Sequence, residues 1–272
     1  MTGWSCSRLE GGRMEYGREL AVAKEAAVLA GEAIMETYRA GDFDVAYKDD
    51  ESPLTAADTR ANKIIADILS REFPDYAVLA EESEDDKSRL KNDYCFIVDP
   101  LDGTKEFIKG NGQFTVNIAL AHKHRSVMGA VYVPVTGELY YAASGFGAYC
   151  EHDGFPTVRL KASERTSDLR LLLSATHGNW QEEKLIEKYD IKNFRRIGSS
   201  LKGCLIAKGE ADVFYRYGLT CEWDTAAMQC VAEQAGAVFR QMDGAEMLYN
   251  REDTVNRKGF FIVNRAENAL EL

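Results

Sequence analysis

Two stretches of the first half carry the spacing of amphipathic helices, and a series of short apolar runs follows them. From Glu15 to Arg39 the apolar residues recur every three or four positions until Gly41 ends the pattern. Thr55, three residues before Asp58, resembles a capping box for a second helix that continues through Ile65 and Leu69. The β-rich runs are Phe114 to Ala121, Val127 to Pro134, Gly137 to Ala142 and Gly147 to Cys150. Turn residues separate these runs, which predicts an antiparallel meander.

The second half alternates strands with helices, which favours an α/β layer. Predicted strands cover Leu171 to Ser174, Asn193 to Gly198, Ala211 to Arg216, Ala237 to Arg240 and Gly259 to Val263. Predicted helices begin at Ser199, cover Asp224 to Gly236 and form a short tail after the last strand. A polar stretch around 156–167 marks the boundary between halves. We therefore expect a loose extension over 1–13, one half over 14–162 and a second over 163–272, in an α/β (α+β layered) fold.

Composition limits the classes of function. A net charge of −11 over 272 residues argues against a polymeric nucleic acid or a membrane surface as partner. A small anion remains open, because a bound divalent cation reverses the local charge. The six cysteines include no Cys-x-x-Cys pair, several lie in apolar runs, and no apolar stretch is long enough to span a bilayer. These features predict free thiols and a cytoplasmic location, with monomer and homodimer both open.

The chemistry centres on the stretch from Asp99 to Phe107, which reads Asp-Pro-Leu-Asp-Gly-Thr-Lys-Glu-Phe. It follows a buried strand over 94–98, so two carboxylates lie where that strand is expected to end, at a proline that cannot continue the ladder. Gly103 permits a sharp turn, and Thr104 can open a helix whose N–H groups face an anion. Oxygen ligands beside such a turn suit a magnesium-dependent phosphatase. A strand-to-turn connection in which these residues only punctuate the chain is the alternative.

Two further motifs favour the first interpretation. Glu81-Glu82-Ser83 follows a short predicted strand, and Glu222 to Ala227 reads Glu-Trp-Asp-Thr-Ala-Ala. In this order the three motifs resemble those of the inositol monophosphatase superfamily, lithium-sensitive, magnesium-dependent phosphatases. The resemblance implies an αβαβα sandwich, with an antiparallel-sheet first half packed on a smaller α/β second half. The pattern Asp-x-Ser-Pro-x-Thr-x-x-Asp from Asp50 to Asp58 is similar to the CysQ-type 3′(2′),5′-bisphosphate nucleotidases.

The resemblance implies a ligand set for two magnesium ions, and up to three. One ion would take Glu81, Asp99 and the backbone carbonyl of Leu101, and the other would take Asp99, Asp102 and Asp224. The catalytic candidates that orient or deprotonate the attacking water are Thr104, Glu81 and Asp50. Asp58 is expected to order its loop, for instance by pairing with Lys48.

The same resemblance places substrate contacts in both halves. The N–H groups of Gly103 and Thr104 would hold the reacting phosphate, and Asp224 would face it. Ser199, Lys202 and Arg216 would contact a nucleotide, and His177 lies where relatives carry a nucleotide-contacting histidine, although the residues before it depart from the usual pattern. The alternative for Lys202 and Arg216 is that both are ordinary solvated surface residues.

The resulting hypothesis is a phosphatase that hydrolyses the 3′-phosphate of 3′-phosphoadenosine 5′-phosphate to AMP, with this small molecule as its partner. An inositol monophosphatase or a broad sugar-phosphate phosphatase is the alternative, and a non-catalytic nucleotide sensor is the alternative from a different class. Loss of a metal carboxylate would favour the sensor, yet all of the expected carboxylates are present.

Overall fold

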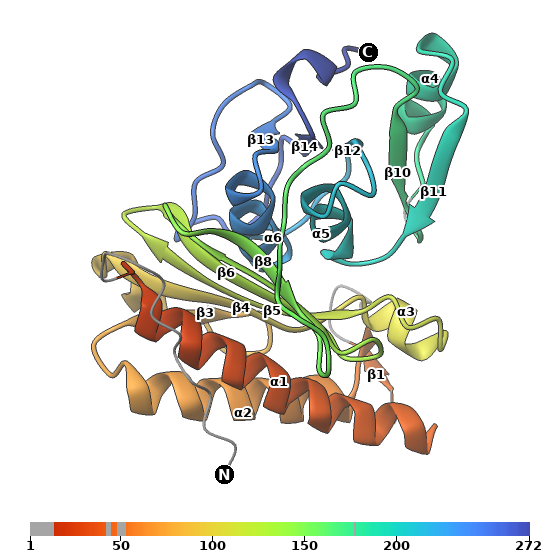
Figure 1. Ribbon diagram of the computed structural model, residues 1–272. Coiled ribbons are helices and arrows are strands. Elements are labelled where there is room, and N and C mark those ends of the chain that lie inside the picture. Colours follow the sequence, from red (N-terminus) through yellow and green to blue (C-terminus); the bar gives the residue numbers. More distant parts are fainter. Residues whose placement is uncertain (1–13, 42–44, 48–52, 177) are drawn as a thin grey trace.

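The chain folds into stacked layers of helices and sheets. The computed structural model describes residues 14–41, 45–47, 53–176 and 178–272. Figure 1 shows two long helices beneath a sheet, a second pair of helices above that sheet, and another sheet beyond them. A helix lies against the outer face of the second sheet. The αβαβα sandwich predicted from the motifs is confirmed.

The first helical layer consists of α1 (Gly17–Ala40) and α2 (Ala56–Glu72). Both helices bury one apolar stripe against the same cluster, which includes Ile34, Ile65 and Phe96 of the sheet above. The predicted capping box is present at the start of α2, where Thr55 and Asp58 satisfy each other's backbone groups. Between the helices a short antiparallel pair joins β1 (Ala46–Tyr47) to β2 (Pro53–Leu54).

The first sheet has seven strands in the order β3-β4-β5-β6-β7-β8-β9. They are β3 (Ala77–Ala80), β4 (Tyr94–Asp102), β5 (Thr115–His122), β6 (Arg125–Val133), β7 (Glu138–Ala143), β8 (Gly147–Glu151) and β9 (Val158–Arg159). Every neighbouring pair except β3 with β4 is antiparallel, so the predicted meander is confirmed. The connections carry η1 (Ser88–Lys91) and α3 (Thr104–Ile108).

The second sheet is mixed, with the order β11-β10-β12-β14-β13. Its strands are β10 (Arg170–Ser174), β11 (Asn193–Ile197), β12 (Val213–Arg216), β13 (Val238–Gln241) and β14 (Phe260–Val263). The helices are α4 (Trp180–Lys188), α5 (Leu201–Ala207) and α6 (Glu222–Gln234). The predicted tail helix is a single 3₁₀ turn, η2 (Ala266–Asn268).

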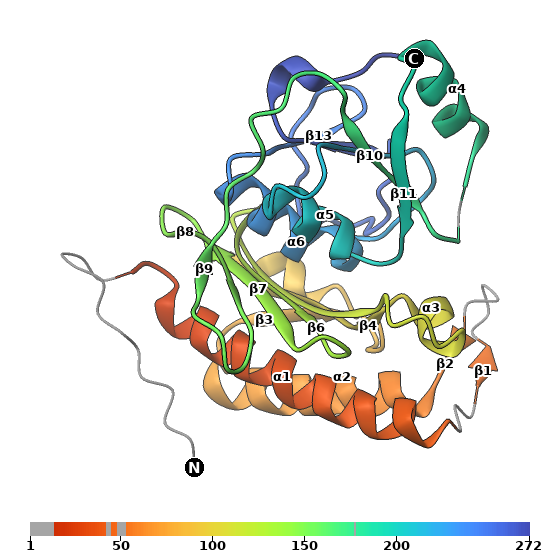
Figure 2. The ribbon, with the colours of Figure 1, turned by 45° about the vertical axis from the view of Figure 1, so that its right-hand side comes forward.

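The side chains of β10 show how the second sheet is covered. Leu172 points into the core shared with α5, α6 and the first sheet, while Leu171 and Leu173 pack with Leu185 of α4 on the opposite face. In Figure 2, α5 and α6 lie between the two sheets and α4 stands beside β10 and β11. Residues from both halves therefore form one continuous core. None of the helices in the described ranges is long and apolar enough to cross a membrane.

Helix α6 approaches the first sheet unusually closely at Gly129 of β6. A Cβ atom at this glycine would lie 2.4 Å from the backbone oxygen of Ala227 and 3.0 Å from its Cα. Ser126, on the same strand, donates a 2.7 Å hydrogen bond to the carbonyl oxygen of Ala226. Because only glycine fits at this contact, it fixes the distance between α6 and the sheet.

Candidate active site

Asp99 and Asp102 are brought together by an irregularity in β4. Pro100 does not end the strand as the sequence predicts: β4 continues to Asp102. Asp99 pairs with Asn117 of β5 and Asp102 with Thr115, so two residues of β4 face one of β5. This bulge accommodates a proline that lacks an N–H, and the Leu101 amide turns to donate a 3.0 Å bond to Asp99 Oδ1.

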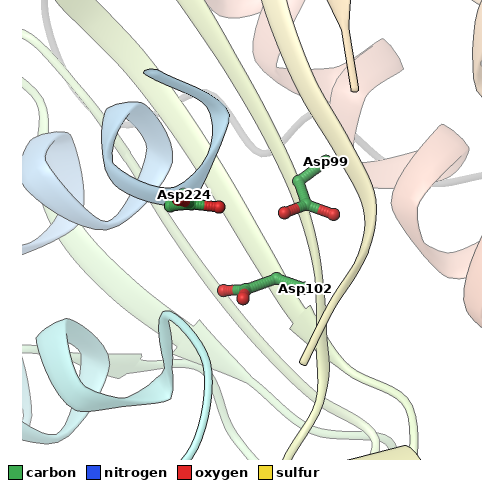
Figure 3. Close-up of side chains that lie close together, drawn as sticks. All are labelled: Asp99, Asp102 and Asp224. Carbon is green, nitrogen blue, oxygen red and sulfur yellow. The ribbon is translucent and has the colours of Figure 1, made fainter. Parts of the chain in front are cut away.

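Asp224 reaches the same place from the second half, in the first turn of α6. The backbone N–H of Cys221, at the start of this helix, donates a 2.6 Å hydrogen bond to Asp224 Oδ2. Figure 3 shows the carboxylates of Asp99, Asp102 and Asp224 pointing toward one another. One oxygen from each lies within 4.8 Å of the others. The three predicted metal-site aspartates are therefore adjacent in space although they are distant in sequence.

These carboxylates repel one another in the absence of a cation. Asp99 is 1% exposed, and burial together with the charges of Glu81, Asp102 and Asp224 holds the pKa of Asp99 well above its ordinary value. Burial and the charge of Asp102 likewise raise the pKa of Asp224. A set of oxygen donors whose ionised form is disfavoured fits a hard divalent cation, which would offset the repulsion. The residues could hold a metal, and Glu81 lines a cavity together with Asp102 and Asp224.

Asp102 is held by residues that the motifs do not include. The N–H of Ser200 donates a 2.6 Å hydrogen bond to Asp102 Oδ2, and the Ser200 hydroxyl lies 2.7 Å from the same oxygen. Asn117 of β5 donates to it at 3.2 Å. The signal that could have identified Ser200 is its place beside the predicted substrate residue Ser199. Ser200 thereby links the second half directly to the carboxylate of the first.

Thr104 lies beside Asp58, a contact that sequence reasoning missed. The Thr104 hydroxyl is 3.3 Å from Asp58 Oδ1 and 3.2 Å from the carbonyl oxygen of Leu101. Asp58 Oδ2 accepts hydrogen bonds from the N–H and the hydroxyl of Thr55, at 2.7 and 2.5 Å. One oxygen of Asp58 therefore caps α2 while the other faces Thr104. The predicted partner Lys48, and the candidates Asp50 and His177, lie outside the described residues.

A cavity of about 290 Å³ joins the carboxylates to the predicted substrate residues. Its walls include Glu81, Asp102, Gly103, Thr104, Ser199, Lys202, Arg216 and Asp224. Gly103 has a φ of +93°, which confirms the predicted sharp turn before α3. Lys202 and Arg216 thus border the cavity with the acidic residues instead of lying on a remote surface.

Lys202 is almost enclosed. It is 7% exposed, and its Nζ donates to the carbonyl oxygens of Ser199 at 2.7 Å and Ile197 at 3.2 Å. Burial lowers the pKa of Lys202 to about 8, against the opposing charge of Asp102. Arg216 donates from Nη2 to the carbonyl oxygen of Leu219 at 3.1 Å and from Nη1 to the Ser174 hydroxyl at 3.4 Å.

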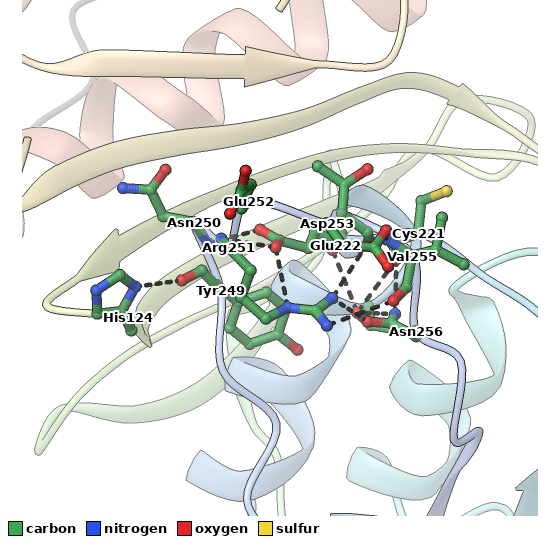
Figure 4. A network of polar contacts seen from close by, with 12 residues as sticks. His124, Cys221, Glu222, Tyr249, Asn250, Arg251, Glu252, Asp253, Val255 and Asn256 are labelled. Atoms are coloured by element: carbon green, nitrogen blue, oxygen red, sulfur yellow. Dashed lines mark hydrogen bonds and ion pairs between the residues drawn. The ribbon is translucent and has the colours of Figure 1, made fainter. Parts of the chain in front are cut away.

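A polar network secures the start of α6 (Figure 4). Glu222 is fully buried and accepts hydrogen bonds from the N–H groups of Asn250 and Arg251, at 2.6 and 2.9 Å, and from Arg251 Nε at 3.1 Å. Asn256 donates at 2.9 Å to the carbonyl oxygen of Cys221. The segment 249–256 is thereby tied to the turn that presents Asp224.

Comparison with known proteins gives a consistent picture. Residues 17–270 match the model of the inositol monophosphatase family. The 3′(2′),5′-bisphosphate nucleotidases CysQ of Escherichia coli O157:H7 and Salmonella typhimurium are 41% and 40% identical over 234 residues, covering 85% of this chain and 94% of each relative. The crystal structure of CysQ from Bacteroides thetaiotaomicron, described as a bacterial member of that family, has a TM-score of 0.81 at 38% identity. The match covers 93% of this chain and 100% of the chain in that crystal structure.

Proposed function

Because the chain belongs to the inositol monophosphatase family, we propose that it is a magnesium-dependent phosphatase acting on a nucleotide with two phosphates. The substrate would be 3′-phosphoadenosine 5′-phosphate, and the products AMP and phosphate. The observation that carries the proposal is one cavity whose lining combines the carboxylates of Asp102 and Asp224, its acidic wall, with the cations of Lys202 and Arg216, its basic wall. The acidic wall suits a metal-bound phosphate, and the basic wall suits a second phosphate.

Two magnesium ions, and up to three, would be held by Glu81, Asp99, the Leu101 carbonyl, Asp102 and Asp224. A bound cation supplies charge neutralisation for the phosphate and an acidified water as nucleophile. The remaining work falls to the chain's own residues. Thr104 can accept a hydrogen bond from the attacking water while its own hydroxyl donates to Asp58 Oδ1, 3.3 Å away. Thr104 would thereby orient the water, and Glu81 or Asp50 would take up the proton that the water loses.

The basic wall would fix the other end of the substrate. Lys202 belongs to α5, and Arg216 lies at the end of β12. An inositol monophosphate has no second phosphate to occupy them. This difference favours a bisphosphate over the alternative substrates. The complete set of metal-site carboxylates supports a catalytic role over a non-catalytic sensor.

Initial rates on three substrates test the proposal. With magnesium, we expect 3′-phosphoadenosine 5′-phosphate to be hydrolysed faster than adenosine 3′-phosphate, which lacks only the 5′-phosphate, and faster than inositol 1-phosphate. EDTA should abolish all three rates. Equal kcat/KM for the two nucleotides would show that no second phosphate is recognised.

The variant Arg216→Ala tests whether this arginine binds the second phosphate. Loss of a charge-assisted contact to a phosphate typically costs about 1.5–3 kcal/mol, or roughly ten- to a hundred-fold in kcat/KM. We expect this loss for the bisphosphate alone, with adenosine 3′-phosphate unaffected. An equal loss on both nucleotides would instead assign Arg216 to the fold or to the metal site.

A further inference from the structure

Two arginines converge on Ser174, the last residue of β10. Strands β11 and β12 flank β10 and run parallel to it, so all three end at the same edge of the sheet. Arg196 of β11 donates from Nη1 to the carbonyl oxygen of Ser174 at 2.9 Å, and Arg216 of β12 donates from Nη1 to the Ser174 hydroxyl at 3.4 Å. Such a concentration of positive charge requires a counter-charge.

Glu182, in the first turn of α4, occupies the position for that role. It is 3% exposed, and its Oε2 lies 3.8 Å from Arg196 Nη1. Among the described residues, no hydrogen-bond donor of normal geometry reaches either of its carboxylate oxygens. Burial raises the pKa of Glu182, while the backbone groups of Ser174 and Asn179 and the charges of Arg196 and Arg216 oppose that rise. An almost enclosed carboxylate that lacks hydrogen bonds of good geometry costs stability unless nearby cations compensate.

Arg216 is weakly held by its own hydrogen bonds. Its Nε is buried and has no partner within the part of the chain that the structure describes, and its two bonds measure 3.1 and 3.4 Å. The guanidinium borders two cavities, one shared with Asp224 and the other with Asn179 and Gln181 of the α4 start. Glu182 follows Gln181 directly in α4, and its charge acts on Arg216 together with the charges of Asp224 and Asp102.

These attractions have different consequences. A guanidinium drawn toward Asp224 would neutralise a carboxylate that a cation needs, and would leave the position where a distant phosphate can be bound. We propose that Glu182 is a positioning residue that holds Arg216 away from the metal-site carboxylates and toward the anionic group of the substrate. The second part of this role rests on the proposed function, whereas the first part does not.

A double-mutant cycle in magnesium binding tests the first part without any substrate. Glu182→Gln removes the charge and keeps the shape, and its effect on the magnesium Kd is measured by calorimetry in the wild-type and Arg216→Ala backgrounds. We expect the Kd to rise about three- to ten-fold in the wild-type background and to stay unchanged without Arg216. Glu183→Gln, an exposed neighbour in the same helical turn, should leave the Kd unchanged.

Equal losses in both backgrounds, or an equal loss in Glu183→Gln, would overturn the proposal, because the effect would then not pass through Arg216. Unaltered magnesium binding in Glu182→Gln would overturn it too. If that variant does not fold, Glu182→Asp, which draws the charge back, is taken through the same cycle with the same expectation in smaller measure.

The KM for 3′-phosphoadenosine 5′-phosphate, at saturating magnesium, tests the second part. Glu182→Gln should raise this KM several-fold with little change in kcat, and should leave adenosine 3′-phosphate unaffected. A lowered KM would contradict positioning, since it would mean that Glu182 only weakens the positive potential. If the wild-type protein does not hydrolyse the bisphosphate, the proposed function fails, and the magnesium cycle still decides the role of Glu182.

Discussion

The close contact between Gly129 and α6 predicts that a single methyl group will damage catalysis from within the core. In Gly129→Ala the new Cβ would lie 2.4 Å from the Ala227 backbone oxygen, and ordinary contacts begin near 3.4 Å. Helix α6 must therefore retreat by about 1 Å, because backbone on both sides cannot swing away. Asp224 lies one turn earlier on this helix and moves with it.

Two effects follow from that displacement. Overpacking a filled core costs about 1–3 kcal/mol of unfolding free energy. A shift of about 1 Å in a catalytic group can cost about a hundred-fold in rate. We expect Gly129→Ala to remain folded, to lose stability within this range and to lose about two orders of magnitude in kcat/KM. Urea titration measures the first, and initial rates at saturating magnesium measure the second.

Gly31→Ala is the matched control, because Gly31 lies in α1, which packs on the other face of the same sheet. Its Cβ would also meet its nearest neighbour at 2.4 Å, but that neighbour is the side chain of Tyr132, which is partly exposed and can move. We expect a loss of stability and a wild-type rate. If Gly129→Ala kept the wild-type rate while losing stability, α6 would not need its exact spacing from the sheet, and the reasoning would be wrong.

Further predictions concern the charges of the site. Asp99→Asn should abolish turnover and raise the Tm of the metal-free protein, because it removes a buried carboxylate whose ionisation is disfavoured; substantial residual activity at saturating magnesium contradicts the ligand assignment. The metal-free Tm should fall as pH rises above about 4, because the raised pKa values of Asp99 and Asp224 mean that the folded state binds more protons than the unfolded one, and magnesium should reverse this fall. Lithium should inhibit by occupying the magnesium position of Asp99, Asp102 and Asp224, so a rate that lithium leaves unchanged would contradict this prediction. Lys202 is charged below its pKa of about 8 and neutral above it, so the preference for the bisphosphate over adenosine 3′-phosphate should decline as pH rises through 8, and Lys202→Met should remove that decline.

The helices and strands could be predicted from local patterns, whereas the layered sandwich and the metal-ligand set followed from the resemblance of three motifs to a known family. The period of the first helix, the meander and the Asp-Pro-Leu-Asp stretch are all readable within a few residues. Pro100 misled the strand boundary, since a bulge accommodates the missing N–H only when a partner strand is present. The hydrogen bonds of Ser200 to Asp102 and of Thr104 to Asp58 join segments that only the tertiary fold brings together, so the sequence offered no more than the place of Ser200 beside Ser199.

The enclosure of α6 between two sheets separates what this chain can change from what it cannot. Its residues from Thr225 to Ala232 are all buried, so almost every substitution there meets a packed neighbour. Strand β11, in contrast, is an edge strand whose first four residues are exposed. A duplicated copy of the gene could therefore accumulate substitutions along this edge while inheriting the same hydrolytic chemistry. In such a lineage substitutions should appear first among the exposed residues of β11 that make no contact with Ser174 or Glu182, and last in α6.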